Sequence, residues 1–224
     1  MPRRRVFFMR AFRVQKPGRL ARTLGSLLAL SVTLAPSSAA QGTFTVGPLV
    51  GQVESRQLHS HGDDTQTRSD AVLGVFVDVA TPLAWLHIGV EASFARRGGD
   101  YETTTAAGPT TQSARIDYLS FALMPTVWHD FGPVALYVSL GFARESSFGV
   151  GSTAELAPLF SEPASEVFAL VAAAGLEVSI MRGWSARLEV RELNQVSPAF
   201  RPPSGDIRHR SREFVIKVGM RPGG

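Results

Sequence analysis

Residues 85–95 read WLHIGVEASFA, a run in which apolar and polar side chains alternate one by one. Leu86, Ile88 and Val90 would share one face of an extended strand, while His87 and Glu91 would share the other. This follows because successive side chains of a β-strand point to opposite sides. The stretch therefore predicts a strand with one apolar and one polar face.

The same alternation recurs along most of the remaining chain. We predict further strands at 43–53, 72–80, 115–128, 133–143, 166–179, 184–193 and 212–221. These segments run to about ten residues, which suits a tilted strand that crosses a bilayer. The predicted fold class is all-β: a transmembrane antiparallel up-and-down β-barrel of about eight strands.

The connections between the predicted strands alternate in length. Short ones fall near Thr81–Ala84, His129–Gly132 and Ile180–Gly183, and long polar ones near 54–69, 97–113, 144–164 and 195–211. Short periplasmic turns that alternate with longer extracellular loops are typical of outer-membrane barrels. Loops on a rigid scaffold often carry binding, so a possible extracellular ligand is expected at the long ones.

All three tryptophans, Trp85, Trp128 and Trp184, lie beside the short turns. Indole rings favour the membrane–water interface, where the ring is apolar and the N–H is hydrated. The positions predict an aromatic girdle at one end of the barrel, with ordinary core or turn tryptophans as the alternative.

The charged residues within the strands fall almost entirely on the polar face. They are Asp78, His87, Glu91, Glu177, Arg187, Glu189, Arg191, Glu213 and Lys217, whereas Asp117 and Glu192 lie on the apolar face near strand ends. An eight-stranded barrel has room inside for side chains but not for a wide pore. Because an unpaired buried charge is costly, we expect an ion-pair network in the lumen, with a proton or ion path as the alternative.

The N-terminal region has the features of an export signal. A basic segment precedes the apolar stretch Leu24–Ala35, and Ser38-Ala39-Ala40 supplies the small residues of a cleavage site before Gln41. We expect residues 1–40 to be a signal peptide and 41–224 to be the barrel domain. The apolar stretch is shorter than the ~20 residues of a membrane-spanning helix.

The formal charge of +4 depends on that N-terminal segment. Eight of the 23 Lys and Arg lie in residues 1–40, which leaves 15 against all 19 Asp and Glu. The remaining part is therefore acidic, and the high pI gives no support to nucleic-acid binding. The absence of Cys excludes a disulfide framework and thiolate metal sites.

Several segments resemble the small outer-membrane β-barrel domain family that includes PorT-like and OmpA-like eight-stranded barrels. Gly74–Val79 followed by Leu86–Gly98 is similar to the strand–turn–strand of that family, with an inward Glu91. Ile116–Leu123, Gly132–Gly141 and Gly175-Leu176-Glu177 also fit its strands. The resemblance implies an outer-membrane location, with outer-membrane lipids and the barrel-assembly machinery as partners.

Three groups of residues are candidates for a chemical role. His59-Ser60-His61-Gly62-Asp63-Asp64 could bind a metal, and His87 with Glu91 could form an acid–base pair as in lipid-modifying barrel enzymes. Gly149-Val150-Gly151-Ser152 has no strand-to-helix context for phosphate binding and is interpreted as a loop. The other readings are a polar loop for the first group and a lumen hydrogen-bond network for the second, so no catalytic, cofactor-binding or metal residue is assigned.

The leading hypothesis is a monomeric, non-enzymatic outer-membrane barrel that presents surface loops or supports the envelope. No cofactor and no nucleic-acid partner are expected. The alternatives are a barrel enzyme that acts on envelope lipids and a soluble periplasmic ligand-binding barrel.

Overall fold

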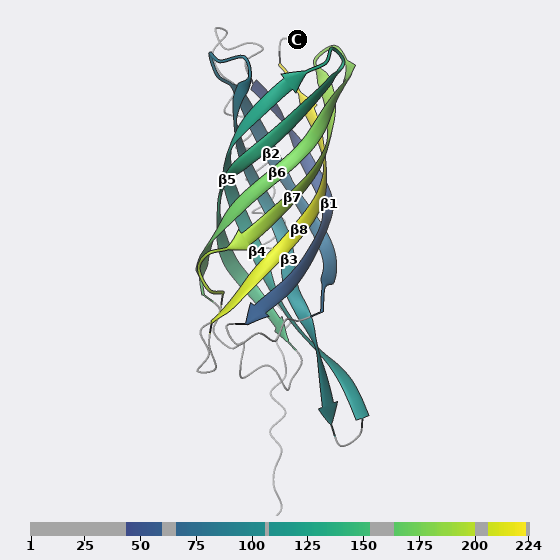
Figure 1. Cartoon of the computed structure of the whole chain (residues 1–224), viewed down its shortest axis with the longest axis vertical. Helices are drawn as coiled ribbons and strands as arrows, with labels where there is room; N and C mark the ends of the chain where they lie inside the picture. Colours follow the sequence, from purple (N-terminus) through teal and green to yellow (C-terminus); the bar gives the residue numbers. More distant parts are fainter. Residues whose placement is uncertain (1–43, 60–65, 106–107, 153–163, 200–205, 223–224) are drawn as a thin grey trace, which may run out of the picture. The chain divides into compact units, whose positions relative to one another are not determined.

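The computed structural model describes residues 44–59, 66–105, 108–152, 164–199 and 206–222. Within them the chain forms eight antiparallel strands that close into a barrel in sequence order, with β1 paired to β8 (Figure 1). The strands are β1 (Phe44–His59), β2 (Arg68–Ala80), β3 (Leu86–Thr105), β4 (Gly108–Asp130), β5 (Val134–Ser152), β6 (Glu166–Met181), β7 (Trp184–Gln195) and β8 (Ile207–Met220). The predicted fold class is confirmed. No helix of the described residues is long and apolar enough to cross a membrane.

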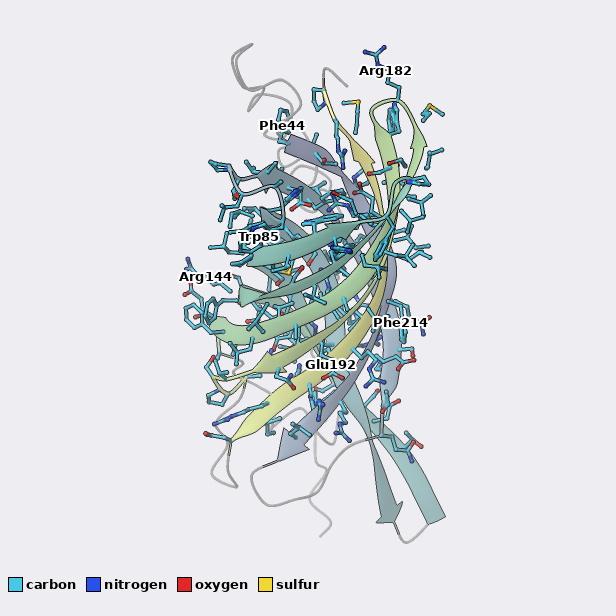
Figure 2. The ribbon with its side chains drawn as sticks, turned by 45° about the horizontal axis from the view of Figure 1, so that its top comes forward. Phe44, Trp85, Arg144, Arg182, Glu192 and Phe214 are labelled. Atoms are coloured by element: carbon cyan, nitrogen blue, oxygen red, sulfur yellow. The ribbon has the colours of Figure 1, made fainter. Side chains whose placement is uncertain are left out.

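The two faces of each strand differ as the alternation predicts. On β5, Leu136 and Val138 are 50% and 56% exposed on the outside, whereas Tyr137 between them is buried in the lumen. Burial on β8 alternates without interruption from Ile207 to Met220. The barrel wall is therefore apolar on its outer side, where Phe214 lies (Figure 2).

Tight turns connect the strands at one end of the barrel. β6 and β7 are separated only by Arg182 and Gly183, and Gly183 has a φ of 77°. Gly132, between β4 and β5, has a φ of 81°. Side chains with a Cβ rarely adopt this left-handed conformation, so glycine at both positions favours the turn.

The strands extend further toward the other end than the sequence predicted. Residues 97–113 were expected to be a long loop, but β3 and β4 are separated only by residues 106 and 107. Likewise β5 runs to Ser152, so Gly149–Ser152 is strand rather than loop. The apolar alternation ends where the outer face becomes polar, although the backbone pairing continues. The sequence pattern therefore underestimates the length of these strands.

The aromatic girdle is only partly as predicted. Trp85 and Trp184 are exposed, at 52% and 44%, as an interfacial indole should be. Trp128 instead lies inside, with its ring 4.7 Å from that of Tyr137. Its even position on β4 places it on the same face as Ser120 and Ala122, which determines its side of the wall.

Candidate functional site

Charged side chains fill the lumen of the barrel. Six acidic residues take part (Asp78, Glu91, Glu145, Glu177, Glu189 and Glu213), together with the bases Arg97, Arg187, Arg191, Lys217 and Arg221. Apart from Arg221 at the mouth, each of these side chains is at most 4% exposed. The predicted lumen network is therefore present.

Arg187 on β7 binds two carboxylates at the end of the lumen with the short turns. It donates to Asp78 on β2 and, over 2.6 Å, to Glu177 on β6. Its guanidinium also lies 4.8 Å from the ring centre of Trp128 and 4.9 Å from that of Phe76. Inside the barrel, the positive charge of this arginine is therefore paired with carboxylates, and its planar face lies against aromatic rings.

Arg191, four residues further along β7, forms the middle layer. It donates to Glu91 on β3 and, over 2.6 Å, to Glu213 on β8. Lys217 on β8 donates to the same Glu91 and to Glu189, 2.7 Å away. Glu189 also accepts a hydrogen bond from the hydroxyl of Tyr137 at 3.0 Å. The pairs therefore join strands from opposite sides of the barrel.

Arg97 and Glu145 complete the network toward the other end of the lumen, although the alternation in the sequence did not predict them there. Arg97 on β3 donates to Glu145 on β5 and to Glu213 on β8. Both residues fell in segments interpreted as loops. Their odd positions continue the inward faces of Glu91 and Ala143, so the strand period carried the missing signal.

Little free space remains between these side chains. The hollow bounded by Phe76, Glu91, Tyr137, Arg187 and Lys217 has a volume of only about 10 Å³. That is roughly the space of one water molecule. The middle of the lumen therefore has no room for a substrate.

The structure separates His87 from Glu91. Both lie on the inward side of β3, but His87 packs against Trp128, with ring centres 5.0 Å apart. Glu91 is held instead by Lys217 and Arg191. The arrangement matches a structural network rather than an acid–base pair.

The candidate metal-binding segment lies largely outside the described residues. Of His59–Asp64, only the backbone of His59 is described, at the end of β1. Among the described residues no group of three His, Asp or Glu is arranged to hold a metal ion.

The sequence model of the outer membrane protein beta-barrel domain family matches residues 24–221, a segment that covers most of the chain. The chain belongs to this family. No curated protein matches the sequence. Among solved structures, the chain is similar to the outer membrane protein OprG from Pseudomonas aeruginosa, with 11% identity, a TM-score of 0.51 and coverage of 80% of this chain and 94% of the other.

Two further solved barrels are also similar to the chain. Neisserial surface protein A has 11% identity, a TM-score of 0.49 and coverage of 80% of this chain and 96% of its own. Outer membrane protein W of E. coli has 15% identity, a TM-score of 0.44 and coverage of 81% and 98%. At these identities the likeness to OprG shows the fold alone.

Family membership and the apolar outer wall place the protein in the outer membrane. A soluble periplasmic barrel would turn its charged face to water and its apolar face inward. This barrel does the reverse, since Leu140 and Phe142 are 67% and 66% exposed while Glu91 and Glu177 are each 3% exposed. The soluble alternative is therefore excluded.

Proposed function

We propose that this outer-membrane barrel is a closed, non-enzymatic scaffold that holds extracellular segments at the cell surface. The observation that supports this best is the filled lumen. Interlocking ion pairs connect β2, β3, β5, β6, β7 and β8 across the interior, around a hollow of only about 10 Å³.

The β3–β4 hairpin supports the surface-presenting part of the proposal. The ladder between β3 and β4 continues to Thr105 and Gly108, whereas the ladder between β4 and β5 ends at Ala114 and Ser152. The hairpin consequently projects beyond the rest of the wall (Figure 1). Its end is opposite to the short turns, which is the extracellular end in barrels of this kind.

A liposome-swelling assay tests the closed state. The barrel, refolded into vesicles, should admit arabinose or glucose no faster than vesicles without protein. As a positive control, Glu91→Ser, Arg191→Ser and Lys217→Ser combined should open the middle layer and raise the swelling rate, provided that the triple variant folds. Sugar entry through the wild-type barrel would contradict the proposal.

The non-enzymatic part is tested on envelope lipids. Refolded wild-type protein should release no fatty acid from phospholipid or lipopolysaccharide above the rate without protein. Hydrolysis that is abolished by His87→Ala would show that the lumen network carries chemistry.

A further inference from the structure

The mouth of the barrel at the end with the short turns contains a cavity of about 180 Å³. Since one water takes up about 30 Å³ in the liquid, this cavity holds several water molecules or one small polar ligand. The residues that line it come from β1, β2, β3, β4 and the position after β8: Phe44, Thr45, Asp78, Ala80, His87, Trp128, Asp130 and Arg221. The cavity therefore lies at the opening, outside the filled middle of the lumen.

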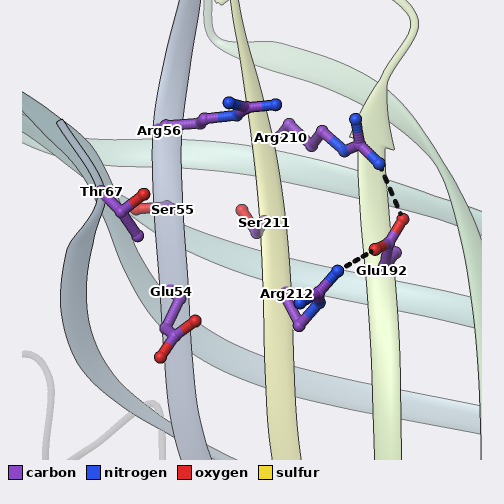
Figure 3. Close-up of a pocket in the computed structure, with 8 residues that line it drawn as sticks. All are labelled: Glu54, Ser55, Arg56, Thr67, Glu192, Arg210, Ser211 and Arg212. Atoms are coloured by element: carbon purple, nitrogen blue, oxygen red, sulfur yellow. Dashed lines mark hydrogen bonds and ion pairs between the residues drawn. The ribbon is translucent and has the colours of Figure 1, made fainter. Parts of the chain in front are cut away.

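A second hollow, on the outer wall where β1, β7 and β8 meet, provides a contrast. Glu192 on β7 pairs there with Arg210 at 3.1 Å and with Arg212 at 2.8 Å (Figure 3). Glu54 lies directly opposite Arg212 in the ladder between β1 and β8. Opposite charges thus face one another in that hollow without a ligand, whereas the cavity in the mouth is lined by polar groups that lack a partner.

The indole N–H of Trp128 is the first of these groups. Trp128 is 6% exposed, and its Nε1 is buried without a hydrogen-bond partner in the described part of the chain. The ring lies between His87 of β3, with ring centres 5.0 Å apart, and Tyr137 of β5, at 4.7 Å. Because these neighbours cover the ring on both sides, the edge that carries the N–H is left to border the cavity. A buried donor without an acceptor is costly, so a ligand that accepts this hydrogen bond is favoured.

The carboxylate of Asp130 is the second group. Asp130 is the last residue of β4, two positions after Trp128 on the same face of the strand. Its side chain makes no ion pair and no hydrogen bond within the ranges that the structure describes. His87, half-buried in the same lining, adds ring nitrogens that can donate or accept. The cavity therefore offers a donor inside and an acceptor at its rim.

The other charges of the mouth are paired with one another. Arg221 donates to Glu177 over 2.7 Å, and Asp78 accepts from Arg187. A carboxylate ligand would have to compete with Glu177 for Arg221, and it would also lie close to Asp130. A cationic ligand would meet the positive charge of Arg221. The charges of the lining therefore favour an uncharged ligand.

The hydroxyl groups of a sugar ring fit this set of partners. Each hydroxyl both donates and accepts, so a single ring can accept from Trp128 and donate to Asp130. Phe44, at the end of β1 (Figure 2), adds an apolar surface on which the carbon face of the ring can pack. An aromatic wall with a few fixed polar groups is the usual composition of a small-molecule site.

We propose that the mouth of the barrel at its short-turn end binds one ring of a neutral sugar. One ring hydroxyl accepts from Trp128 Nε1, another donates to Asp130, and the carbon face of the ring packs on Phe44. Because the middle of the lumen is filled, the sugar is held at the mouth and does not pass through. A free monosaccharide and the end of a glycan chain present the same ring to this site.

A charge series on one sugar ring tests the chemistry of the site. The barrel is refolded in a detergent without a sugar headgroup and titrated by ligand-observed NMR with methyl glucoside, glucosamine and glucose 6-phosphate. Methyl glucoside should bind at least about threefold more tightly than either charged sugar, which is the scale of an exposed charge interaction. Absence of methyl glucoside binding would overturn the proposal, as would equal or tighter binding of a charged sugar.

Cellotriose distinguishes the two sources of the ring. If the site takes the end of a glycan chain, cellotriose should bind at least as tightly as methyl glucoside. If the site takes a free monosaccharide, cellotriose should bind more weakly. Both results support a site for one ring, provided that the variants below weaken the binding.

Two variants remove the proposed hydrogen bonds. Trp128→Phe keeps an aromatic ring but removes the N–H, and it should weaken methyl glucoside binding about fivefold, as expected for one lost hydrogen bond. Trp184→Phe is the matched control, because Trp184 is 44% exposed on the outer wall at the same end, and it should leave binding unchanged. Asp130→Ala, at an exposed position, should weaken binding at least about tenfold, and it serves if Trp128→Phe fails to fold.

Filling the cavity tests its position. Ala80 lines the cavity at the end of β2, so Ala80→Phe should abolish binding, with folding checked by the mobility of unheated samples in gels. Unchanged binding in Ala80→Phe would overturn the proposal by placing the sugar elsewhere. Equal losses in Trp128→Phe and Trp184→Phe would overturn it as well.

Discussion

Arg97 Nη2 on β3 lies 2.8 Å from Glu213 Oε1 on β8, although β1 and β2 separate these strands in the wall. Both side chains are at most 1% exposed. The pair therefore connects two parts of the barrel through its interior and stabilises the closed wall from within.

Removal of this arginine should destabilise the barrel strongly. Arg97→Ala leaves Glu145 and Glu213 without a shared partner, and breaking a buried pair costs about 3–5 kcal/mol. Arg144→Ala removes an arginine from a pair that is 57% and 46% exposed, so it should cost no more than about 1 kcal/mol. Urea unfolding in lipid vesicles measures both, and equal costs would show that the lumen pair is not structural.

The hydroxyl of Tyr137 supports the middle layer through Glu189. Tyr137→Phe removes the 3.0 Å hydrogen bond to that carboxylate and keeps the ring against Trp128. Because a hydrogen bond to a charged group contributes about 1.5–3 kcal/mol, the same unfolding measurement should show a loss in that range. An unchanged stability would mean that Lys217 alone satisfies Glu189.

These lumen contacts also show what the sequence could and could not reveal. The period-two pattern predicted the inward side of Glu91, Glu177 and Arg187, because a strand offers only two faces. It missed Arg97 and Glu145, because each follows the outward arginine, Arg96 or Arg144, that ends the uninterrupted apolar alternation of its strand. Which charge meets which across the lumen depends on barrel closure and stagger, and neither is encoded in local alternation.

The same limit applies to the arginines where β1 pairs with β8. Arg208 and Arg210 fell in a segment interpreted as a loop, and the chain places Arg56 far from both. Only the closing pair of β1 with β8 brings Arg56 opposite Arg210. Pairing between the first and last strands is a long-range contact that no window of sequence can display.

The orientation of the barrel can be tested with single cysteines, since the chain has none of its own. Ala106→Cys lies between β3 and β4, and Leu83→Cys lies in the short connection between β2 and β3. A membrane-impermeant maleimide should label the first in intact cells and the second only after the outer membrane is permeabilised. The opposite pattern would invert the proposed orientation.

Processing of the N-terminal segment remains a prediction from its basic and apolar pattern. N-terminal sequencing of the protein from outer membranes should begin at or within a few residues of Gln41. A mature protein that still begins at Met1 or Met9 would show that the segment is not cleaved.

The most direct test of the barrel's orientation toward lipid is one substitution on each face of the wall. Val138 lies on the outer side in the middle of the apolar stretch from Val134 to Phe142, whereas Glu177 lies in the lumen. Arginine at the bilayer midplane costs roughly 2–4 kcal/mol, and the cost falls toward zero at the interface. Trp85→Arg, beside a short turn, is therefore the matched control.

The measurement is the fraction folded in lipid vesicles, read from the mobility of unheated samples in gels. We predict that Val138→Arg sharply lowers this fraction, while Trp85→Arg and Glu177→Gln fold in much larger yield. Normal folding of Val138→Arg together with failure of Glu177→Gln would contradict a barrel whose apolar face meets lipid and whose charges fill the lumen.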